Sequence, residues 1–213
     1  MVLVVSLAVV VLLLGGVLIA LKLRPVEASS SRTVTKLDVW KKAVHDNGED
    51  PWNWLGLGLA LQDNNDPGGA SDAFNKALEL EPNNWMANLQ VALLIKDQDP
   101  ERAIKMLNLS GENAPVISKP SPYTALGDIL YAQGNYKAAR IAFAKGEAAM
   151  PDVFQLRMGL GRSLQALGDH KGALEEYKKA LQLIPGSREA LDAIDNVNQN
   201  AAPSPPALPS PQA

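Results

Sequence analysis

The chain has 213 residues, a net charge of −3, no cysteine and only two histidines. A slightly acidic chain does not favour general nucleic-acid binding, which normally needs an excess of basic residues. The lack of cysteine excludes disulfides, thiolate metal sites and thiol catalysis. The composition therefore favours a binding protein over an enzyme, and it predicts no metal and no cofactor.

The first feature along the chain is an apolar segment without charge, residues 2–21. A helix of about 20 residues rises about 30 Å, which matches the hydrocarbon core of a bilayer. We therefore predict a transmembrane anchor over residues 1–24. A cleaved signal peptide, cut near Ala28, is the alternative. It is disfavoured because no basic region precedes the apolar run, which is also long for a signal peptide.

The charges around this segment predict which side of the membrane the rest of the chain occupies. Lys22, Arg24, Arg32 and Lys36 follow the segment, and only the α-amino group precedes it. Because basic residues are retained on the cytoplasmic side, this distribution places the main domain in the cytoplasm.

A linker and a leading helix are predicted next. Residues 25–34 include three consecutive serines and are predicted to be flexible. The leading helix is assigned to residues 35–50, with its helical pattern over residues 35–46. Apolar residues recur there at helical spacing. They are Leu37, Trp40, Ala43 and Val44.

Residues 51–186 repeat with a period close to 34. The marker residues Gly58, Ala92, Gly127 and Gly161 are separated by 34, 35 and 34 residues. Three units are clear, and the second of the four is degenerate. The other shared positions are Ala70, Phe74, Ala77 and Pro82, then Ala139, Phe143, Gly146 and Pro151, then Ala173, Tyr177, Ala180 and Pro185.

This pattern resembles the tetratricopeptide repeat, whose consensus W-x2-L-G-x2-Y…A-x3-F…P has the same period. The resemblance implies an all-α fold, a right-handed superhelix of helical hairpins (an α-solenoid), preceded here by the single transmembrane helix. Stacking of neighbouring pairs would supply the stability of such an array.

The turn inside each repeat carries a capping residue. Gly134 and Gly168 are predicted to adopt the left-handed conformation that closes a helix. Prolines at the ends of the clear units are predicted to stop the second helices. The N-caps of the second helices are predicted at Asp66, Asp99, Asn135 and Asp169.

The end of the array has three further features. Residues 110–122, after the degenerate unit, are polar and proline-rich; we predict a bulging loop, as a tolerated insertion rather than a recognition loop. Ser187 is predicted to begin a capping helix over residues 187–200, whose outer face is charged. Residues 201–213 are rich in proline and are predicted to be disordered.

In this family the first helix of each pair lines a concave groove, so the resemblance implies a site that binds a protein partner. Relatives that hold a peptide carboxylate use a basic clamp, but here Ser121 and Ala125 are among the matching residues. The groove therefore favours an apolar or amphipathic segment. The alternative is that some of its leucines pack against the leading helix. The implied groove residues are Leu55, Leu59, Leu89, Gln90, Leu93, Thr124, Asp128, Met158 and Arg162.

An anchor followed by repeats resembles bacterial inner-membrane assembly factors, most closely the repeat proteins of c-type cytochrome maturation. Residues 53–61, Ala70 and residues 74–78 carry this resemblance. It implies an interaction scaffold that helps to assemble a membrane or cytochrome complex. Those relatives work outside the cytoplasm, opposite to the side that the flanking charges predict. A permanent structural subunit is the alternative function.

The charges of the repeat region are unevenly distributed. Residues 46–112 contain 12 acidic and 4 basic residues, a net charge of −8, whereas residues 113–188 contain 6 acidic and 10 basic residues, a net charge of +4. This asymmetry favours an oriented partner or head-to-tail self-association. His45 and His170 are predicted to face solvent, and neither has a partner at metal-ligand spacing.

Overall fold

The computed structural model describes residues 11–14, 17–20 and 34–201. The chain divides into two compact units, Met1–Thr35 and Lys36–Ala213. Residues 25–33 of the linker predicted over 25–34, and residues 202–213 of the tail predicted over 201–213, lie outside the described residues. Residues 1–10, 15–16 and 21–24 of the predicted anchor lie outside them as well.

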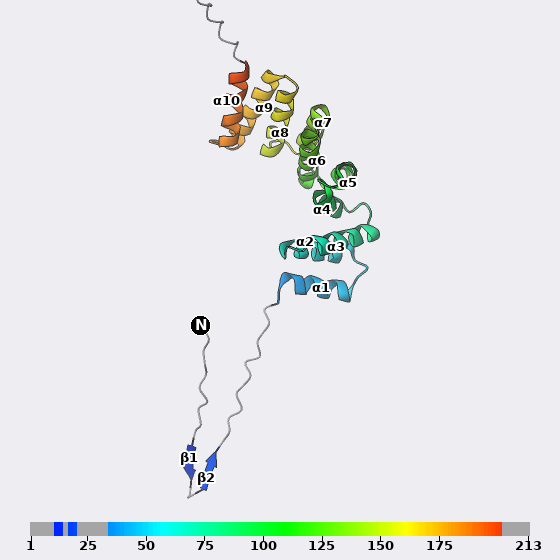
Figure 1. Cartoon of the computed structure of the whole chain (residues 1–213), viewed down its shortest axis with the longest axis vertical. Helices are drawn as coiled ribbons and strands as arrows, with labels where there is room; N and C mark the ends of the chain where they lie inside the picture. Colours follow the sequence, from blue (N-terminus) through cyan, green and yellow to red (C-terminus); the bar gives the residue numbers. More distant parts are fainter. Residues whose placement is uncertain (1–10, 15–16, 21–33, 202–213) are drawn as a thin grey trace, which may run out of the picture. The chain divides into compact units, whose positions relative to one another are not determined.

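The N-terminal unit contains two antiparallel strands, β1 (Val11–Leu14) and β2 (Val17–Ala20), in which Val11 pairs with Ala20 (Figure 1). The helix predicted across this segment is not found, and no helix among the described residues is long and apolar enough to cross a membrane. The sequence suits the strands, because valine and isoleucine favour extended backbone.

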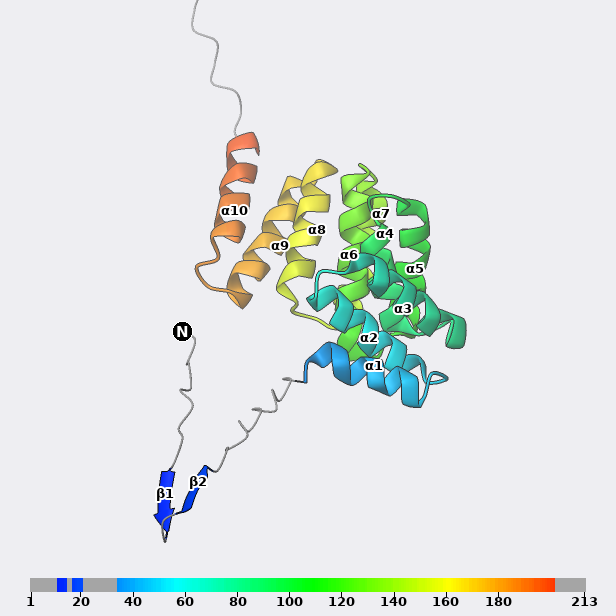
Figure 2. The same ribbon diagram turned by 60° about the horizontal axis from the view of Figure 1, so that its bottom comes forward.

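The second unit is an array of α-helices that follow one another in pairs (Figures 1 and 2). Helices α2 and α3, α4 and α5, α6 and α7, and α8 and α9 form the pairs, and each pair packs on the next. The all-α array predicted from the repeats is therefore confirmed in this unit. Its helices are α1 (Lys36–Asp46), α2 (Pro51–Asp63), α3 (Pro67–Leu80), α4 (Trp85–Ile95), α5 (Pro100–Asn113), α6 (Pro120–Ala132), α7 (Tyr136–Ala149), α8 (Phe154–Ala166), α9 (His170–Leu183) and α10 (Arg188–Ala201).

All four predicted N-caps are confirmed. The side chain of Asp169, for example, accepts a hydrogen bond from the backbone N–H of Gly172 at 2.9 Å. Asp66, Asp99 and Asn135 cap α3, α5 and α7 in the same way. Gly134 and Gly168 have φ values of +75° and +82°, so the predicted left-handed turns are also confirmed.

The prolines end the second helices as predicted. Helices α3, α7 and α9 each stop two residues before Pro82, Pro151 or Pro185. The residue before a proline is displaced from helical backbone because the ring clashes with it. Glu81 and Met150 accordingly have φ values of −135° and −142°.

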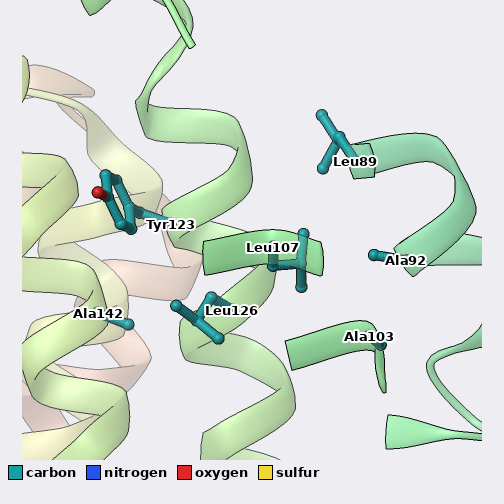
Figure 3. Close-up of a cluster of buried hydrophobic side chains, with 7 residues drawn as sticks. All are labelled: Leu89, Ala92, Ala103, Leu107, Tyr123, Leu126 and Ala142. Carbon is teal, nitrogen blue, oxygen red and sulfur yellow. The ribbon is translucent and has the colours of Figure 1, made fainter. Parts of the chain in front are cut away.

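In each clear pair an aromatic ring of the second helix packs against a glycine of the first helix. A Cβ atom on Gly127 would lie 2.5 Å from the Phe143 ring, and one on Gly161 would lie 2.4 Å from the Tyr177 ring. In the degenerate unit Ala92 replaces this glycine. The core there is built by the seven side chains drawn in Figure 3, which come from α4 to α7: Leu89, Ala92, Ala103, Leu107, Tyr123, Leu126 and Ala142.

The prediction of a bulging loop over residues 110–122 is wrong. Helix α5 continues to Asn113 and α6 begins at Pro120, with a short 3-10 turn, η1 (Val116–Ser118), between them. Ser110 is fully buried, and its hydroxyl donates to the backbone oxygen of Trp85 at 2.7 Å. The prolines misled the prediction because proline is well tolerated in the first turn of a helix.

The two ends of the array are covered by single helices. Trp40 of α1 lies over Gly56 of α2, where a Cβ atom would be 2.4 Å from the indole. At the other end Ser187 caps α10, and its Oγ accepts from the N–H of Ala190 at 3.4 Å. Ala190 and Val197 bury the inner face of α10 against the last pair.

Candidate functional site

A groove of about 500 Å³ lies between the first helices of successive pairs, which we call the first-helix groove. Helix α6 contributes most of its lining residues, and the others come from α4, the turn after it and the start of α8. Its residues are Leu89, Leu93, Lys96, Asp97, Pro120, Ser121, Thr124, Ala125, Asp128, Ile129, Ala132, Val153 and Gln155.

The contribution of α6 follows one face of that helix along its whole length. Residues from Pro120 to Ala132 line the groove at intervals of one and three residues, which is a helical stripe. A helix of 13 residues is about 20 Å long. The groove is therefore long enough for three to four turns of a partner helix.

The groove has an apolar floor and a few polar groups. Leu93 is 39% exposed, although it is a large apolar side chain, whereas Leu89, one turn earlier on α4, is buried. Ile129 and Val153 add further apolar surface, and Lys96 brings a charge to the rim. Sites of this composition bind apolar segments and use the polar groups to fix their orientation.

The carboxylate of Asp128 in the groove forms an ion pair with a residue of the next repeat. Arg162 of α8 donates to Asp128 of α6 at 3.0 Å, and its guanidinium lies 5.6 Å from the centre of the Tyr131 ring. Both charged side chains are about half exposed, so the pair contributes at most about 1 kcal/mol to stability. Its main effect is to neutralise Asp128 in the groove.

The structure brings four of the predicted groove residues together and separates the others. Leu89, Leu93, Thr124 and Asp128 line the groove. Arg162 lies beside it through its bond to Asp128.

Two predicted groove residues are corrected by the structure. Leu55 and Met158 are each only 2% exposed and belong to the hydrophobic core. Leu55 packs in the cluster of Phe74, and Met158 packs in the cluster of Tyr177. A side chain buried in this way cannot contact a partner, so these two residues stabilise the array.

The remaining two predicted residues lie on first helices outside the groove lining. Leu59 is half-buried and packs against the same core cluster as Leu55. Gln90 is half-buried on α4.

Sequence reasoning missed several residues that line the groove. Ile129 and Ala132 continue the stripe of Thr124 and Asp128 by one further turn, so the helical period could have found them. Val153 and Gln155 lie at the start of α8. They reach the groove only because α6 and α8 pack side by side, which no local pattern indicates.

A charge network joins the last two pairs. Arg157 of α8 contacts Glu147 of α7 and donates to Glu176 of α9 at 2.9 Å. Burial alone would raise the pKa of Glu176, but hydrogen bonds from Lys179 and Arg157 outweigh it and hold that pKa below its usual value. The three central side chains are 14 to 15% exposed, so the network lies largely inside the array.

The described residues contain no cluster of three or more histidine, aspartate or glutamate side chains arranged to hold a metal. Burial raises the pKa of Tyr177 to about 12, and its hydroxyl donates to Gln165 at 2.9 Å. This tyrosine is a core residue that keeps its proton.

The structure of this array is similar to several solved structures. MamA from Desulfovibrio magneticus RS-1 is 24% identical, with a TM-score of 0.60, and the match covers 71% of this chain and 85% of that one. YrrB, described as a TPR protein with an unusual peptide-binding site, is 18% identical, with a TM-score of 0.66 and coverage of 77% and 84%. PilW, a widely conserved type IV pilus biogenesis factor, is 17% identical, with a TM-score of 0.65 and coverage of 76% and 76%. At these identities the likeness shows the fold alone.

No curated protein matches the chain. Two family models do match it, and both describe the tetratricopeptide repeat: one covers residues 53–84 and the other covers residues 124–188. Together with the stacked helix pairs, these matches show that the array contains tetratricopeptide repeats over residues 53–84 and 124–188.

Proposed function

We propose that this protein is an interaction scaffold that binds an apolar or amphipathic segment of a partner protein in the first-helix groove. The observation that carries the proposal is that one face of α6, from Pro120 to Ala132, lines the same groove as the exposed Leu93 of α4, and that most of the surface there is apolar. An amphipathic helix that lies in such a groove buries its apolar face and leaves its polar face in water.

The charge of the groove favours an apolar or amphipathic segment over the terminal carboxylate of a peptide. Asp128 is neutralised by Arg162, and the remaining charges of the groove, Lys96 and Asp97, are one of each sign. The groove therefore has no excess of positive charge with which to hold a carboxylate. The similar array in YrrB is described as having a peptide-binding site, which supports a peptide-like ligand.

We further propose that residues 2–21 attach the array to the bacterial inner membrane, with the array on the cytoplasmic side. The support is the uncharged apolar sequence and the basic residues that follow it. A two-stranded sheet has unpaired edges, which are unfavourable in lipid, so the segment is expected to become helical there. A reporter fused after Ala213 tests the side, and activity only in the periplasm would contradict the proposed topology.

The proposed role is assembly of a membrane complex, and a permanent structural subunit is the second candidate. A role in cytochrome maturation would require the array on the opposite side of the membrane, so the reporter experiment also tests it. An assembly factor is expected to co-purify with its complex in less than equal amounts and to be missing from the mature complex. A structural subunit is expected at a fixed ratio. Purification of the full-length chain in mild detergent, with quantification of its partners, separates the two.

The groove itself is tested with the double variant Leu93→Arg with Thr124→Arg. Both side chains line the groove, so two arginines place charge on its apolar surface. We expect partner capture by the full-length protein to fall at least tenfold while the circular dichroism spectrum stays helical. The matched control is Ile184→Arg, at a residue that is 47% exposed and lies outside the groove. Unchanged capture by a folded double variant would contradict the proposal.

A further inference from the structure

A second hollow, of about 420 Å³, lies among helices α7, α8 and α9. Leu160 and Leu164 of α8 contribute apolar surface to it. Ile141 of α7 is 54% exposed, and the small side chains of Ala144 and Ala148 leave space beside it. None of these residues belongs to the first-helix groove, so a ligand of this hollow would be distinct from the ligand proposed above.

The charges around this hollow leave an excess of positive charge. Glu176 accepts hydrogen bonds from Arg157 at 2.9 Å and from Lys179 at 2.7 Å, so its charge is already neutralised. Arg140 and Lys145 also line the hollow and form no ion pair within the described part of the chain. The ligand that fits is an apolar group with carboxylates beside it.

Such a group is present at the start of α2. Trp52 is 49% exposed, which is unusual for so large an aromatic side chain, and only Pro51 separates it from the acidic pair Glu49 and Asp50. Its backbone N–H donates to Asp50 at 2.9 Å, which holds the capping carboxylate beside the first turn. Glu49 is exposed. Tryptophan is among the residues that contribute most to protein interfaces.

We propose that Trp52 of one copy inserts into the α7–α9 hollow of a second copy, with Glu49 and Asp50 facing Arg140 and Lys145. The contact must join two copies, because α2 packs on α1 and α3 whereas the hollow belongs to a later part of the array. The net charge is −8 over residues 46–112, which include Trp52, and +4 over residues 113–188, which include the hollow. The acidic part of one copy is therefore attracted to the basic part of the other in the orientation that this contact requires.

The contact is heterologous, since it joins two different surfaces, so repeated contacts produce rings or open chains. One indole and two ion pairs form a small contact area, which places the affinity in the weak range. Because the charges are exposed, raising the salt concentration weakens the association.

Disulfide trapping tests this contact cleanly, because the natural chain has no cysteine. Full-length protein with Asn47→Cys is co-expressed with tagged full-length protein that carries Ala148→Cys, which keeps all four charges of the contact, and the membranes are oxidised. We expect a disulfide-linked dimer of the two forms at least fivefold above that of a control pair, Asn47→Cys with Lys171→Cys. Lys171 is exposed on α9 and does not line the hollow.

Further substitutions show whether the disulfide forms through this contact, by chance collision or through binding at the first-helix groove. Adding Trp52→Ala or Ile141→Asp is expected to reduce trapping to the level of the control pair. Val116→Ala, at an exposed residue away from both surfaces, and Leu93→Arg, in the first-helix groove, are expected to leave it unchanged. Trapping no greater than the control pair, or trapping that persists with Trp52→Ala, would overturn the proposal.

Discussion

Phe74 lies against Gly58 so closely that a Cβ atom on the glycine would be 2.4 Å from the ring. Phe74 is fully buried, so its ring cannot move aside into solvent. The same contact, sixteen residues apart, recurs at Gly127 with Phe143 and in the last pair. The close approach of the two helices in each clear repeat therefore depends on a hydrogen atom at one position.

The first prediction concerns this contact. Gly58→Ala is expected to destabilise the array by about 1–3 kcal/mol, because a methyl group overpacks a filled core. Urea unfolding followed by circular dichroism measures the change. Gly68→Ala is the matched control, since its nearest neighbour would be 3.8 Å away. Equal stability of the two variants would contradict the packing argument.

The second prediction concerns the charge network between α7, α8 and α9. Arg157→Ala is expected to cost about 3–5 kcal/mol, because it removes the arginine shared by the largely buried carboxylates Glu147 and Glu176 and leaves Glu176 with Lys179 alone. Thermal unfolding measures the loss. The control Arg162→Ala, which breaks a half-exposed pair, should cost no more than about 1 kcal/mol. A smaller loss for Arg157→Ala than for Arg162→Ala would be inconsistent with a structural network.

The third prediction is an acid dependence that arises from Glu176. Its pKa is lowered in the folded array, so its ionised form stabilises the fold above the ordinary value of 4.5. That stabilisation is lost as the pH falls below 4.5 and through the lower folded pKa. Glu176→Gln is expected to flatten this part of the stability curve. Urea unfolding between pH 3 and pH 6 measures it, and parallel curves for the two proteins would contradict the assignment.

The fourth prediction concerns the stability of the fold at alkaline pH, which depends on Tyr177. The pKa of Tyr177 is raised by burial to about 12, so its neutral form stabilises the fold fully below the ordinary value of 10. This contribution disappears as the pH rises from 10 through 12. We expect the Tyr177→Phe variant to lose less stability than the natural protein over this range. Burial also raises the pKa of Tyr123, so ultraviolet titration should show two of the four tyrosines ionising late, and only one of them in the Tyr177→Phe variant. Normal ionisation of all four would disagree with the burial of Tyr177.

Much of the fold could be predicted because the repeat signals are local. A capping aspartate such as Asp169 and a stop such as Pro185 act within one turn, so their effect does not depend on the tertiary structure. Residues 110–122 were misjudged because polarity and proline are typical both of loops and of helix starts. Ser110 could be recognised as a core residue only from its contact with Trp85, 25 residues away.

The groove was predictable only in part, for a physical reason. Helical periodicity indicates which residues share a face, but a first helix packs on helices on both sides. Leu55 and Leu93 both lie on first helices, yet one is 2% exposed and the other is 39% exposed. That difference is set by how neighbouring repeats pack on each other, which depends on residues far away in the sequence.

The most direct test of the proposed function is site-specific photo-cross-linking from residue 93. A photoreactive amino acid replaces Leu93 in the full-length protein, and Ile184 is replaced in a matched control. We expect residue 93 to cross-link to an apolar or amphipathic segment of one partner, and this product should disappear when Thr124→Arg is added. Equal cross-linking from both positions, or a product at residue 93 that Thr124→Arg leaves unchanged, would contradict binding in the first-helix groove.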